Sequence, residues 1–262
     1  MPPKILVISG PTASGKTRLA VELALRHGGE VVSADSMQVY RRMDIGTAKP
    51  TPEEMRGIPH HMLDVADPEE DFSVARYVEL AAPCVDDILA RGKLPIVAGG
   101  TGLYLDSLLS GRTFAPFSPD GGLRARLEAR FDALGGEAML GELAAADPEA
   151  AARLHPNDRK RIVRALEVFQ QTGKTISQHN RETRALPLRY DALTLSLAFQ
   201  RREDMWDRID RRVDRMMADG LAEEVRALLD SGVPDRCTAM QAIGYKELAA
   251  ALDAGAPVDG AL

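Results

Sequence analysis

Residues 10–17 constrain the fold of this chain more than any other segment. They form the string Gly-Pro-Thr-Ala-Ser-Gly-Lys-Thr and match the pattern G-x-x-x-x-G-K-[ST]. The apolar run Ile5–Ile8 predicts a buried parallel strand before them, and the spacing of apolar residues from Leu19 to Ala24 predicts a helix after them. A glycine-rich turn in this context binds phosphate, because backbone N–H groups and the positive end of the helix attract an anion. The pattern indicates a diphosphate or a triphosphate and does not decide between them.

Each position of this loop has an expected role. Gly10 and Gly15 let the backbone turn around the anion, and Lys16 supplies a positive charge. The hydroxyl of Thr17 is expected to bind a Mg²⁺ ion that bridges the phosphate oxygens. The alternative is an ordinary strand-to-helix turn, which the flanking elements and the Lys-Thr pair disfavour. The expected diphosphate-binding residues of the loop are Gly10, Pro11, Thr12, Ala13, Ser14, Gly15, Lys16 and Thr17.

The composition indicates an ordinary globular protein. A chain of 262 residues with 45% hydrophobic residues can bury a sizeable core, in one large domain or two smaller ones. The apolar run near the N-terminus is too short for a signal sequence or a membrane span, so we expect a cytoplasmic protein without a membrane partner. Cys84 and Cys237 have no paired spacing, which predicts neither a disulfide nor a zinc site.

The net charge of −6 argues against indiscriminate binding to nucleic acid, since backbone affinity depends on Lys and Arg. The densest basic segment is 153–164, which contains Arg153, Arg159, Lys160, Arg161 and Arg164. A local basic surface there could still contact phosphates.

Alternating strand and helix patterns in the first hundred residues predict a parallel sheet. Val31 and Val32 belong to a second strand that ends near Asp35, and a third strand covers Leu94–Ala98. Between them, Ser73 caps a long helix that continues to Arg91 and is expected to kink at Pro83.

The pattern changes after Gly111. Residues 114–122 are a Pro- and Gly-rich linker, residues 123–172 have helical periodicity, and residues 174–188 are polar and irregular. Alternating apolar residues at 193–199 then return the chain to the sheet. Three further helices are expected, at 202–219, 222–229 and 239–252.

Together these patterns predict an α/β protein with a P-loop NTPase-like parallel sheet flanked by helices and an inserted all-helical domain. The expected catalytic core comprises residues 1–112 and 190–262, and the helical insertion comprises residues 113–189.

The third strand argues against a typical ATP-hydrolysing protein. Such proteins carry an Asp at the end of an apolar strand, whereas Leu94–Ala98 is followed by Gly-Gly-Thr-Gly at 99–102, and no guanine-reading Asn-Lys-x-Asp is present. The carboxylate that does end a strand is Asp35, at the edge of the sheet where ligands of α/β proteins bind. By position alone it could be a general base, a metal-associated residue or the cap of a turn. The unusual string from Asp35 to Pro50 favours a functional role.

In this string and others, the sequence resembles the tRNA dimethylallyltransferases, also called isopentenyl-diphosphate:tRNA transferases. The resemblance extends over nearly the whole chain, and the blocks occur in the order typical of the family. The blocks that carry it are 10–17, Asp35-Ser-Met-Gln-Val-Tyr40, Asp44-Ile-Gly-Thr-Ala-Lys-Pro50, Pro59-His-His61, Gly99-Gly-Thr-Gly-Leu-Tyr104, His155-Pro-Asn-Asp158, Arg161-Ile-Val-Arg-Ala-Leu-Glu167 and Ala242-Ile-Gly-Tyr-Lys-Glu247.

The resemblance implies a prenyl transfer. The P-loop would hold dimethylallyl diphosphate with Mg²⁺, and Asp35 would take a proton from N6 of the adenine that lies 3′-adjacent to the anticodon of a tRNA. Thr101 would lie across from Asp35 with its hydroxyl near the reacting atoms, so the two are the expected catalytic residues. Arg212 matches a position expected to contact the diphosphate, with a solvated helix face as the alternative.

The resemblance also implies three groups of tRNA contacts, with the anticodon stem-loop as the part of the tRNA that is bound. Residues 35–38 would read the adenine, residues 160–164 would contact the RNA backbone, and residues 240–245 would add weaker contacts. The expected tRNA-binding residues are therefore Asp35, Ser36, Met37, Gln38, Thr101, Lys160, Arg161, Ile162, Val163, Arg164, Met240, Gln241, Ala242, Ile243, Gly244 and Tyr245. We expect a monomer, and a structural or loop role rather than metal binding for the adjacent His60 and His61.

Three other functions remain as alternatives. A P-loop kinase for a small metabolite or nucleotide would share the sheet and the phosphate loop, and a related prenyltransferase would use free adenine nucleotides. A nucleotide-driven switch or RNA-binding module would need no ionisable Asp35. Members of the tRNA-modifying family continue beyond the block 242–247 into a basic, Trp-containing helical stretch that this sequence does not contain, which implies an effect on tRNA affinity.

Overall fold

The structure is a computed structural model, and it describes residues 2–111, 114 and 121–258. Of the linker expected at 114–122, residues 115–120 lie outside this description. The chain divides into two compact units, which are described separately. Unit 1 comprises Met1–Leu109 and Leu188–Leu262, and unit 2 comprises Ser110–Pro187. Their borders differ by a few residues from those expected for the core and the insertion.

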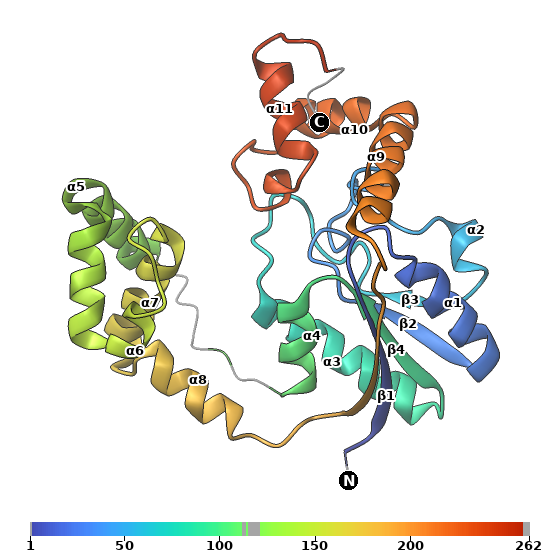
Figure 1. Cartoon of the computed structure of the whole chain (residues 1–262), viewed down its shortest axis with the longest axis horizontal. Coiled ribbons are helices and arrows are strands. Elements are labelled where there is room, and N and C mark those ends of the chain that lie inside the picture. The colour runs from blue at the N-terminus through green and yellow to red at the C-terminus, as the bar shows by residue number, and fades with distance from the viewer. Residues whose placement is uncertain (1, 112–113, 115–120, 259–262) are drawn as a thin grey trace. The chain divides into compact units, whose positions relative to one another are not determined.

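Unit 1 is built on a parallel sheet (Figure 1). Its described strands are ordered β3-β2-β4-β1-β5. Strand β1 pairs with β4 on one side, where Leu6 lies opposite Ile96, and with β5 on the other, where Leu6 lies opposite Leu193. The strands are β1 (Lys4–Ser9), β2 (Gly29–Ser33), β3 (His60–His61), β4 (Leu94–Gly99) and β5 (Asp191–Ser196). The predicted α/β fold is confirmed.

Alternate residues of the central strands pack on opposite faces of the sheet, as the two-residue period of a strand requires. Ile5 and Val7 belong to a core cluster that also contains residues of α3, α10 and α11, whereas Leu6 and Ile8 pack with Ala20 and Ala24 of α1. Apolar cover on both faces explains why the strands are continuous apolar runs. The helices of unit 1 are α1 (Lys16–His27), α2 (Pro52–Met55), α3 (Val74–Ala90), α4 (Gly102–Leu109), α9 (Arg202–Ala218), α10 (Leu221–Asp230), α11 (Tyr245–Asp253) and the 3₁₀ helix η1 (Ala239–Gln241).

Unit 2 is helical throughout its described secondary structure. Its core is formed by Leu127, Met139, Leu143, Ile162 and Leu166, which come from α5 and α7. The helices are α5 (Gly121–Ala146), α6 (Pro148–Ala151), α7 (Arg159–Thr172) and α8 (Ile176–Arg184). Within α5, Gly135 has a non-helical φ of 79°, which interrupts the helix.

Two expectations about secondary structure were wrong. Residues 174–188 contain α8, whose first turn is closed by a capping box: Gln178 N–H donates to Thr175 Oγ1 at 3.1 Å, and Thr175 N–H donates to Gln178 Oε1 at 3.0 Å. The helix expected at 239–252 is divided into η1 and α11, because Gly244 takes a φ of 93° that a helix does not allow. Helix α3 begins after the expected cap Ser73 and continues through Pro83 to Ala90.

Candidate active site

The loop between β1 and α1 has a backbone that few residue types allow. Gly10, Ala13 and Gly15 have φ angles of 152°, 62° and 89°. A Cβ atom on Gly10 would also lie 2.8 Å from the carbonyl oxygen of Leu197, so that position requires glycine. Gly15 precedes α1 and provides no side-chain cap for its first N–H groups. Uncapped N–H groups at the start of a helix are suited to binding an anion.

Lys16 lies folded back over this loop. Its ammonium donates hydrogen bonds to the carbonyl oxygens of Gly10 at 3.0 Å and Pro11 at 2.8 Å. Burial lowers the pKa of Lys16; Asp35 opposes this shift and Arg212 adds to it. Burial also lowers the pKa of Arg212, again opposed by Asp35. The fold therefore brings three predicted site residues, Lys16, Asp35 and Arg212, near enough for their charges to influence one another, although they come from three distant parts of the sequence.

Asp35 follows β2 at the edge of the sheet where the loop lies. Its Oδ1 accepts hydrogen bonds from the backbone N–H groups of Met37 at 2.9 Å and Gln38 at 3.4 Å. One of the three roles left open by the sequence, the cap of a turn, is thus present in the structure. Both bonds use the same oxygen, and among the described residues no hydrogen bond engages Oδ2, which can therefore accept a proton from another group.

Thr101 lies beside Asp35 because the ends of β2 and β4 touch. Ser36 N–H donates to Thr101 Oγ1 at 3.1 Å, and Thr101 Oγ1 donates to Ser36 Oγ at 3.3 Å. The two backbones approach so closely that a Cβ atom on Gly99 would lie 2.1 Å from the carbonyl oxygen of Ala34. Gly99 is therefore required, because a larger residue would push the two backbones apart and move Thr101 away from Ser36.

The side-chain amide of Gln38 is hydrogen-bonded within the protein through both its nitrogen and its oxygen. Its amide nitrogen donates to the carbonyl oxygens of Thr47 at 3.2 Å and Ala48 at 3.1 Å, and Ser33 Oγ donates to its Oε1 at 3.1 Å. Both amide N–H groups are therefore occupied. The side chain connects the site to the loop 44–49, and adenine contact by Gln38 stays a prediction.

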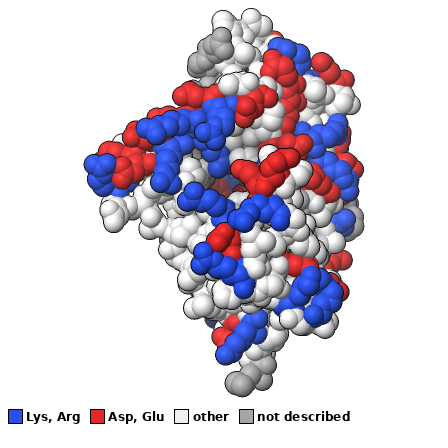
Figure 2. Space-filling model, turned by 90° about the vertical axis from the view of Figure 1, so that its right-hand side faces the viewer, with Lys and Arg blue, Asp and Glu red and all other residues white. Residues whose placement is uncertain are grey.

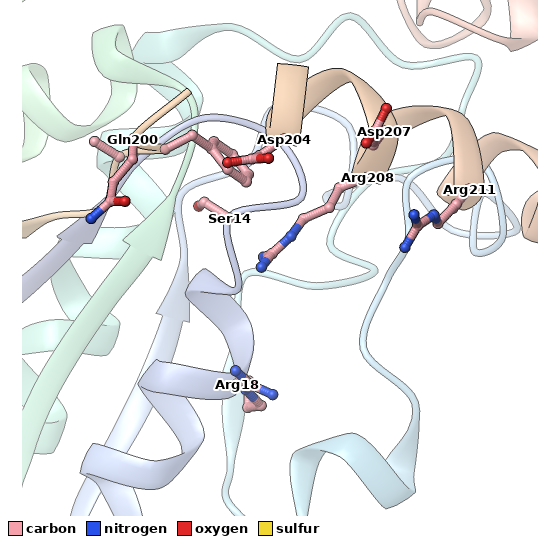
Figure 3. A pocket seen from close by; sticks show the side chains of 9 residues that line it. Ser14, Arg18, Gln200, Asp204, Asp207, Arg208 and Arg211 are labelled. Carbon is pink, nitrogen blue, oxygen red and sulfur yellow. The ribbon is translucent and has the colours of Figure 1, made fainter. Parts of the chain in front are cut away.

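A pocket of about 530 Å³ lies beside the phosphate loop (Figure 3). Ser14 Oγ is buried there without a hydrogen-bond partner among the described residues, which is unusual for a hydroxyl and fits a site for a polar ligand. Arg208 extends from α9 toward the start of α1, and its guanidinium lies 5.3 Å from the ring centre of Phe199. The lining residues are Ser14, Arg18, Ala198, Phe199, Gln200, Asp204, Asp207, Arg208 and Arg211.

Apart from Ser14, no lining residue of this pocket was predicted from the sequence. One signal could have found Arg208: it precedes Arg212 by four residues, so both project from the same face of α9. The other arginines, Arg18 and Arg211, are exposed and have no sequence pattern that separates them from solvated surface residues.

The basic segment of unit 2 offers only part of its expected RNA contacts. Lys160 and Arg161 are exposed, and Arg164 is half-buried and donates to Glu167 Oε2 at 2.7 Å. Ile162 and Val163 are buried in the core of unit 2, which leaves their side chains little surface for RNA, and tRNA contact at these two positions stays a prediction. Acidic and basic side chains are interspersed over the face of the protein that Figure 2 shows.

The block 240–245 is similarly divided. Met240 and Tyr245 are fully buried and Ala242 nearly so, which leaves little of their side chains exposed to a tRNA. Ile243 is 91% exposed. The amide of exposed Gln241 donates to the carbonyl oxygen of Asp235 at 3.1 Å. Within this block the side chains of Gln241 and Ile243 are exposed and Gly244 is buried, and tRNA contact by residues 240–245 stays a prediction.

The described residues include no group of three or more His, Cys, Asp or Glu side chains arranged for a metal ion. His60 Nδ1 lies 2.9 Å from the carbonyl oxygen of Ile58, and His61 Nε2 lies 2.8 Å from Glu30 Oε2, so the two rings engage different partners. Mg²⁺ commonly binds through one or two protein oxygens together with phosphates and water. Thr17, half-buried in the first turn of α1, fits that kind of site.

The fold and the site define a class of protein: an α/β protein with a phosphate-binding loop after β1 and a carboxylate, Asp35, after β2 at the same edge of the parallel sheet. A family model described as IPP transferase matches residues 38–261, and one described as isopentenyl transferase matches residues 3–70. The chain belongs to the tRNA dimethylallyltransferase family, which confirms the resemblance, and it is a transferase.

Relatives and solved structures agree with this assignment. The chain is 52% identical over 252 residues to tRNA dimethylallyltransferase 1 of Trichlorobacter lovleyi, covering 96% of this chain and 82% of the relative. It is similar to the crystal structure of the full-length tRNA isopentenylpyrophosphate transferase of Bacillus halodurans, with a TM-score of 0.68, 43% identity, and coverage of 98% and 80%. A eukaryotic dimethylallyltransferase acting on tRNA gives a TM-score of 0.83 at 32% identity, with coverage of 99% and 65%.

No helix among the described residues is both long and apolar enough to cross a membrane.

Proposed function

We propose that the protein transfers a dimethylallyl group from dimethylallyl diphosphate to N6 of the adenine 3′-adjacent to the anticodon of a tRNA. The C–O bond to the diphosphate breaks, a C–N bond to N6 forms, and the displaced proton goes to Asp35. The observation that carries this proposal is that Asp35 keeps Oδ2 for a proton while it interacts electrostatically with Lys16 and Arg212. A base and two cations are the groups that such a transfer requires.

Charge neutralisation on the leaving diphosphate is supported by several groups from different elements. Lys16 and Arg212 supply the positive charge, and the uncapped start of α1 supplies N–H donors. Ser14 Oγ, buried and without a partner among the described residues, can donate to a phosphate oxygen. Thr17 would hold Mg²⁺ through its hydroxyl, and the ion supplies Lewis-acid neutralisation of the leaving group when bound.

Thr101, which follows β4, would be the second catalytic residue. Its Oγ1 exchanges hydrogen bonds with Ser36 and so holds the segment that begins at Asp35, and in the proposed reaction its hydroxyl would lie near the reacting atoms. The target adenine must leave the stack of its loop to reach Asp35, as bases do in enzymes that modify them.

The anticodon stem-loop is the part of the tRNA that we propose as substrate. Lys160, Arg161 and Arg164 would contact its phosphates, because phosphate contacts rely on such side chains. Arg161 has a side chain that is 73% exposed and lies 3.9 Å from Asp158 Oδ2, a distance at which a phosphate can compete for it. A cytoplasmic location and a monomeric state both stay predictions. Light scattering of the purified protein tests the monomeric state.

The test is an incubation of the protein with Mg²⁺, radiolabelled dimethylallyl diphosphate and unmodified tRNA. Parallel samples contain AMP in place of tRNA, or labelled ATP. Label in tRNA alone, mapped by nuclease digestion to the adenine beside the anticodon, supports the proposal. Label in AMP would instead identify a free-nucleotide prenyltransferase, and ATP turnover without prenyl transfer would identify a kinase.

A further inference from the structure

Glu224, at the start of α10, forms a dense set of hydrogen bonds with a distant loop. Its Oε2 accepts from the backbone N–H groups of Asp44 and Ile45, each at 2.9 Å, and its Oε1 accepts from Gly46 N–H at 3.2 Å. Tyr245 donates its hydroxyl to the same Oε1 at 2.5 Å. Four donors converge on one carboxylate, and backbone N–H groups are strong partners for a carboxylate. A carboxylate held in this way fixes the loop from one side.

Tyr245 fixes the same loop by packing. Its ring lies directly against Gly46, where a Cβ atom would be 2.4 Å from Tyr245 Cε2 and 2.7 Å from Leu221 Cδ1. Burial and the bond to Glu224 raise the pKa of Tyr245, so its hydroxyl stays a donor throughout the working pH range. Gly46 and Tyr245, which belong to two separate sequence blocks, therefore pack directly against each other.

The loop that Glu224 holds also holds the catalytic segment. The carbonyl oxygens of Thr47 and Ala48 accept both bonds from the amide nitrogen of Gln38. The backbone N–H of Gln38, with that of Met37, in turn donates to Asp35 Oδ1. A continuous series of hydrogen bonds thus leads from Glu224 through the loop to one oxygen of Asp35.

Lys49 closes the loop at its other end. Its ammonium, on a side chain that is only 6% exposed, donates to Tyr40 O at 2.8 Å, Asp44 Oδ1 at 2.5 Å and Asp64 Oδ1 at 2.6 Å. Because the loop is fixed at residues 44–46 and at Lys49, the two carbonyl groups between these points have little freedom. Gln38 is therefore anchored to a rigid acceptor pair.

We propose that Glu224, assisted by Tyr245, is a positioning residue for the prenyl transfer: it fixes the loop 44–49 and thereby the orientation of the Asp35 carboxylate. This inference rests on the function proposed above. It also gives the block 242–247 a role besides the predicted RNA contact, since Tyr245 packs against Gly46 of the loop and donates to Glu224. Displacing a catalytic group by about 1 Å can cost about 100-fold in rate.

The matched pair Glu224→Gln and Glu223→Gln tests this role. Both residues lie in the first turn of α10, so both substitutions remove the same charge from the helix start, but Glu223 is exposed. In Glu224→Gln an amide N–H₂ replaces one acceptor and faces the N–H donors of the loop. We expect kcat to fall about 10- to 100-fold with the KM for dimethylallyl diphosphate within about twofold of wild type. Glu223→Gln should match wild type.

A double-mutant cycle separates positioning from a general structural role. If Glu224 acts through Asp35, Glu224→Gln should add less than about twofold to the rate loss of Asp35→Asn, because no base remains to be misplaced. A full additive loss in the Asp35→Asn background would overturn the proposal, as would a kcat of Glu224→Gln equal to wild type. Tyr245→Phe, which removes one of the four donors, should lower kcat in the same direction by a smaller factor.

The proposed function fails in a distinguishable way. If neither the wild type nor Glu223→Gln transfers label to tRNA, the prenyl transfer itself is refuted, and the positioning role with it. If both transfer label and Glu224→Gln transfers it equally well, only the positioning role is refuted. Urea unfolding of each variant provides the check on folding, and for a Glu224→Gln variant that is unfolded the Tyr245→Phe result decides.

Discussion

Substitution of Asp35 by Asn and by Ala separates two roles that one side chain combines. Oδ1 caps the turn through Met37 N–H and Gln38 N–H, at 2.9 and 3.4 Å, whereas Oδ2 is the expected proton acceptor. Asn keeps a carbonyl oxygen at the position of Oδ1 and loses the basic oxygen. Ala loses both. The two variants should therefore be alike in catalysis and different in stability.

The magnitudes follow from these contacts. Loss of a general base typically lowers the rate about 10²- to 10⁴-fold, which corresponds to about 3–5 kcal/mol of transition-state stabilisation, and we expect this of both variants. Only Asp35→Ala removes the acceptor of the 2.9 Å bond and of the longer one. Its free energy of unfolding should fall by about 1 kcal/mol relative to Asp35→Asn.

Single-turnover transfer of labelled dimethylallyl groups to tRNA measures the first effect, and urea denaturation monitored by circular dichroism measures the second. Turnover of Asp35→Asn within about threefold of wild type would remove Asp35 from the role of base. Equal stability of Asp35→Asn and Asp35→Ala would show that the capping bonds do not support the fold, and the argument for an Oδ1 fixed by the backbone would be refuted.

Three further predictions concern other charged groups. Lys16→Ala should weaken binding of dimethylallyl diphosphate, and an affinity unchanged by the substitution contradicts the assignment of the loop. Because burial lowers the pKa of Lys16, the wild-type affinity measured by calorimetric titration should decrease as the pH is raised, and the decrease should begin before the pH reaches the ordinary lysine pKa of 10.5. Neutralising Arg161 and Arg164 to Gln should reduce the slope of log affinity for tRNA against log salt by about 0.7–0.9 per lost phosphate contact, and an unchanged slope would exclude these contacts. Glu30→Gln should lower the free energy of unfolding by about 2 kcal/mol at pH 7, since the 2% exposed carboxylate bonds to three basic side chains. Those bonds hold the pKa of Glu30 far below its usual range, so the stabilisation is complete above the unfolded pKa of about 4.5 and is lost on acidification; a difference from wild type that does not shrink in urea titrations at lower pH would contradict this.

Local sequence patterns were sufficient for the phosphate loop and for β1, β2 and β4, whereas the strand expected at 193–199 is β5 at Asp191–Ser196. The position of Asp35 after β2 could be predicted because the carboxyl ends of parallel strands share one edge of the sheet. Local patterns were less reliable elsewhere. Residues 174–188 were expected to be irregular because they are polar, although Thr175 and Gln178 form the T-x-x-Q signal of a capping box. The prediction of one helix over 239–252 missed the break at Gly244.

Burial limits how far several of the predicted tRNA-binding residues can reach an RNA, although contact by these segments stays a prediction. Ile162, Val163 and Tyr245 lie within blocks that match the family, and Met240 lies two residues before such a block. A match of sequence blocks does not tell which side chains of a block face inward. In α7 two consecutive residues of the expected RNA-binding segment face the core of unit 2, while Lys160 and Arg161 before them are exposed. A helix of 3.6 residues per turn cannot present five consecutive side chains on one face.

The sequence by itself determined the class of fold, the phosphate loop and the acidic residue beside it, because these depend on residues close together in the chain and on a periodicity that packing requires. Only the tertiary structure decided that Glu224 binds the N–H groups of Asp44, Ile45 and Gly46 and that Tyr245 packs against that same loop. The partners are separated by about 180 residues, and a carboxylate on a helix gives no local sign of which backbone it will bind. Such contacts arise when the elements pack, and the free energy that selects them belongs to the assembled core rather than to any one segment.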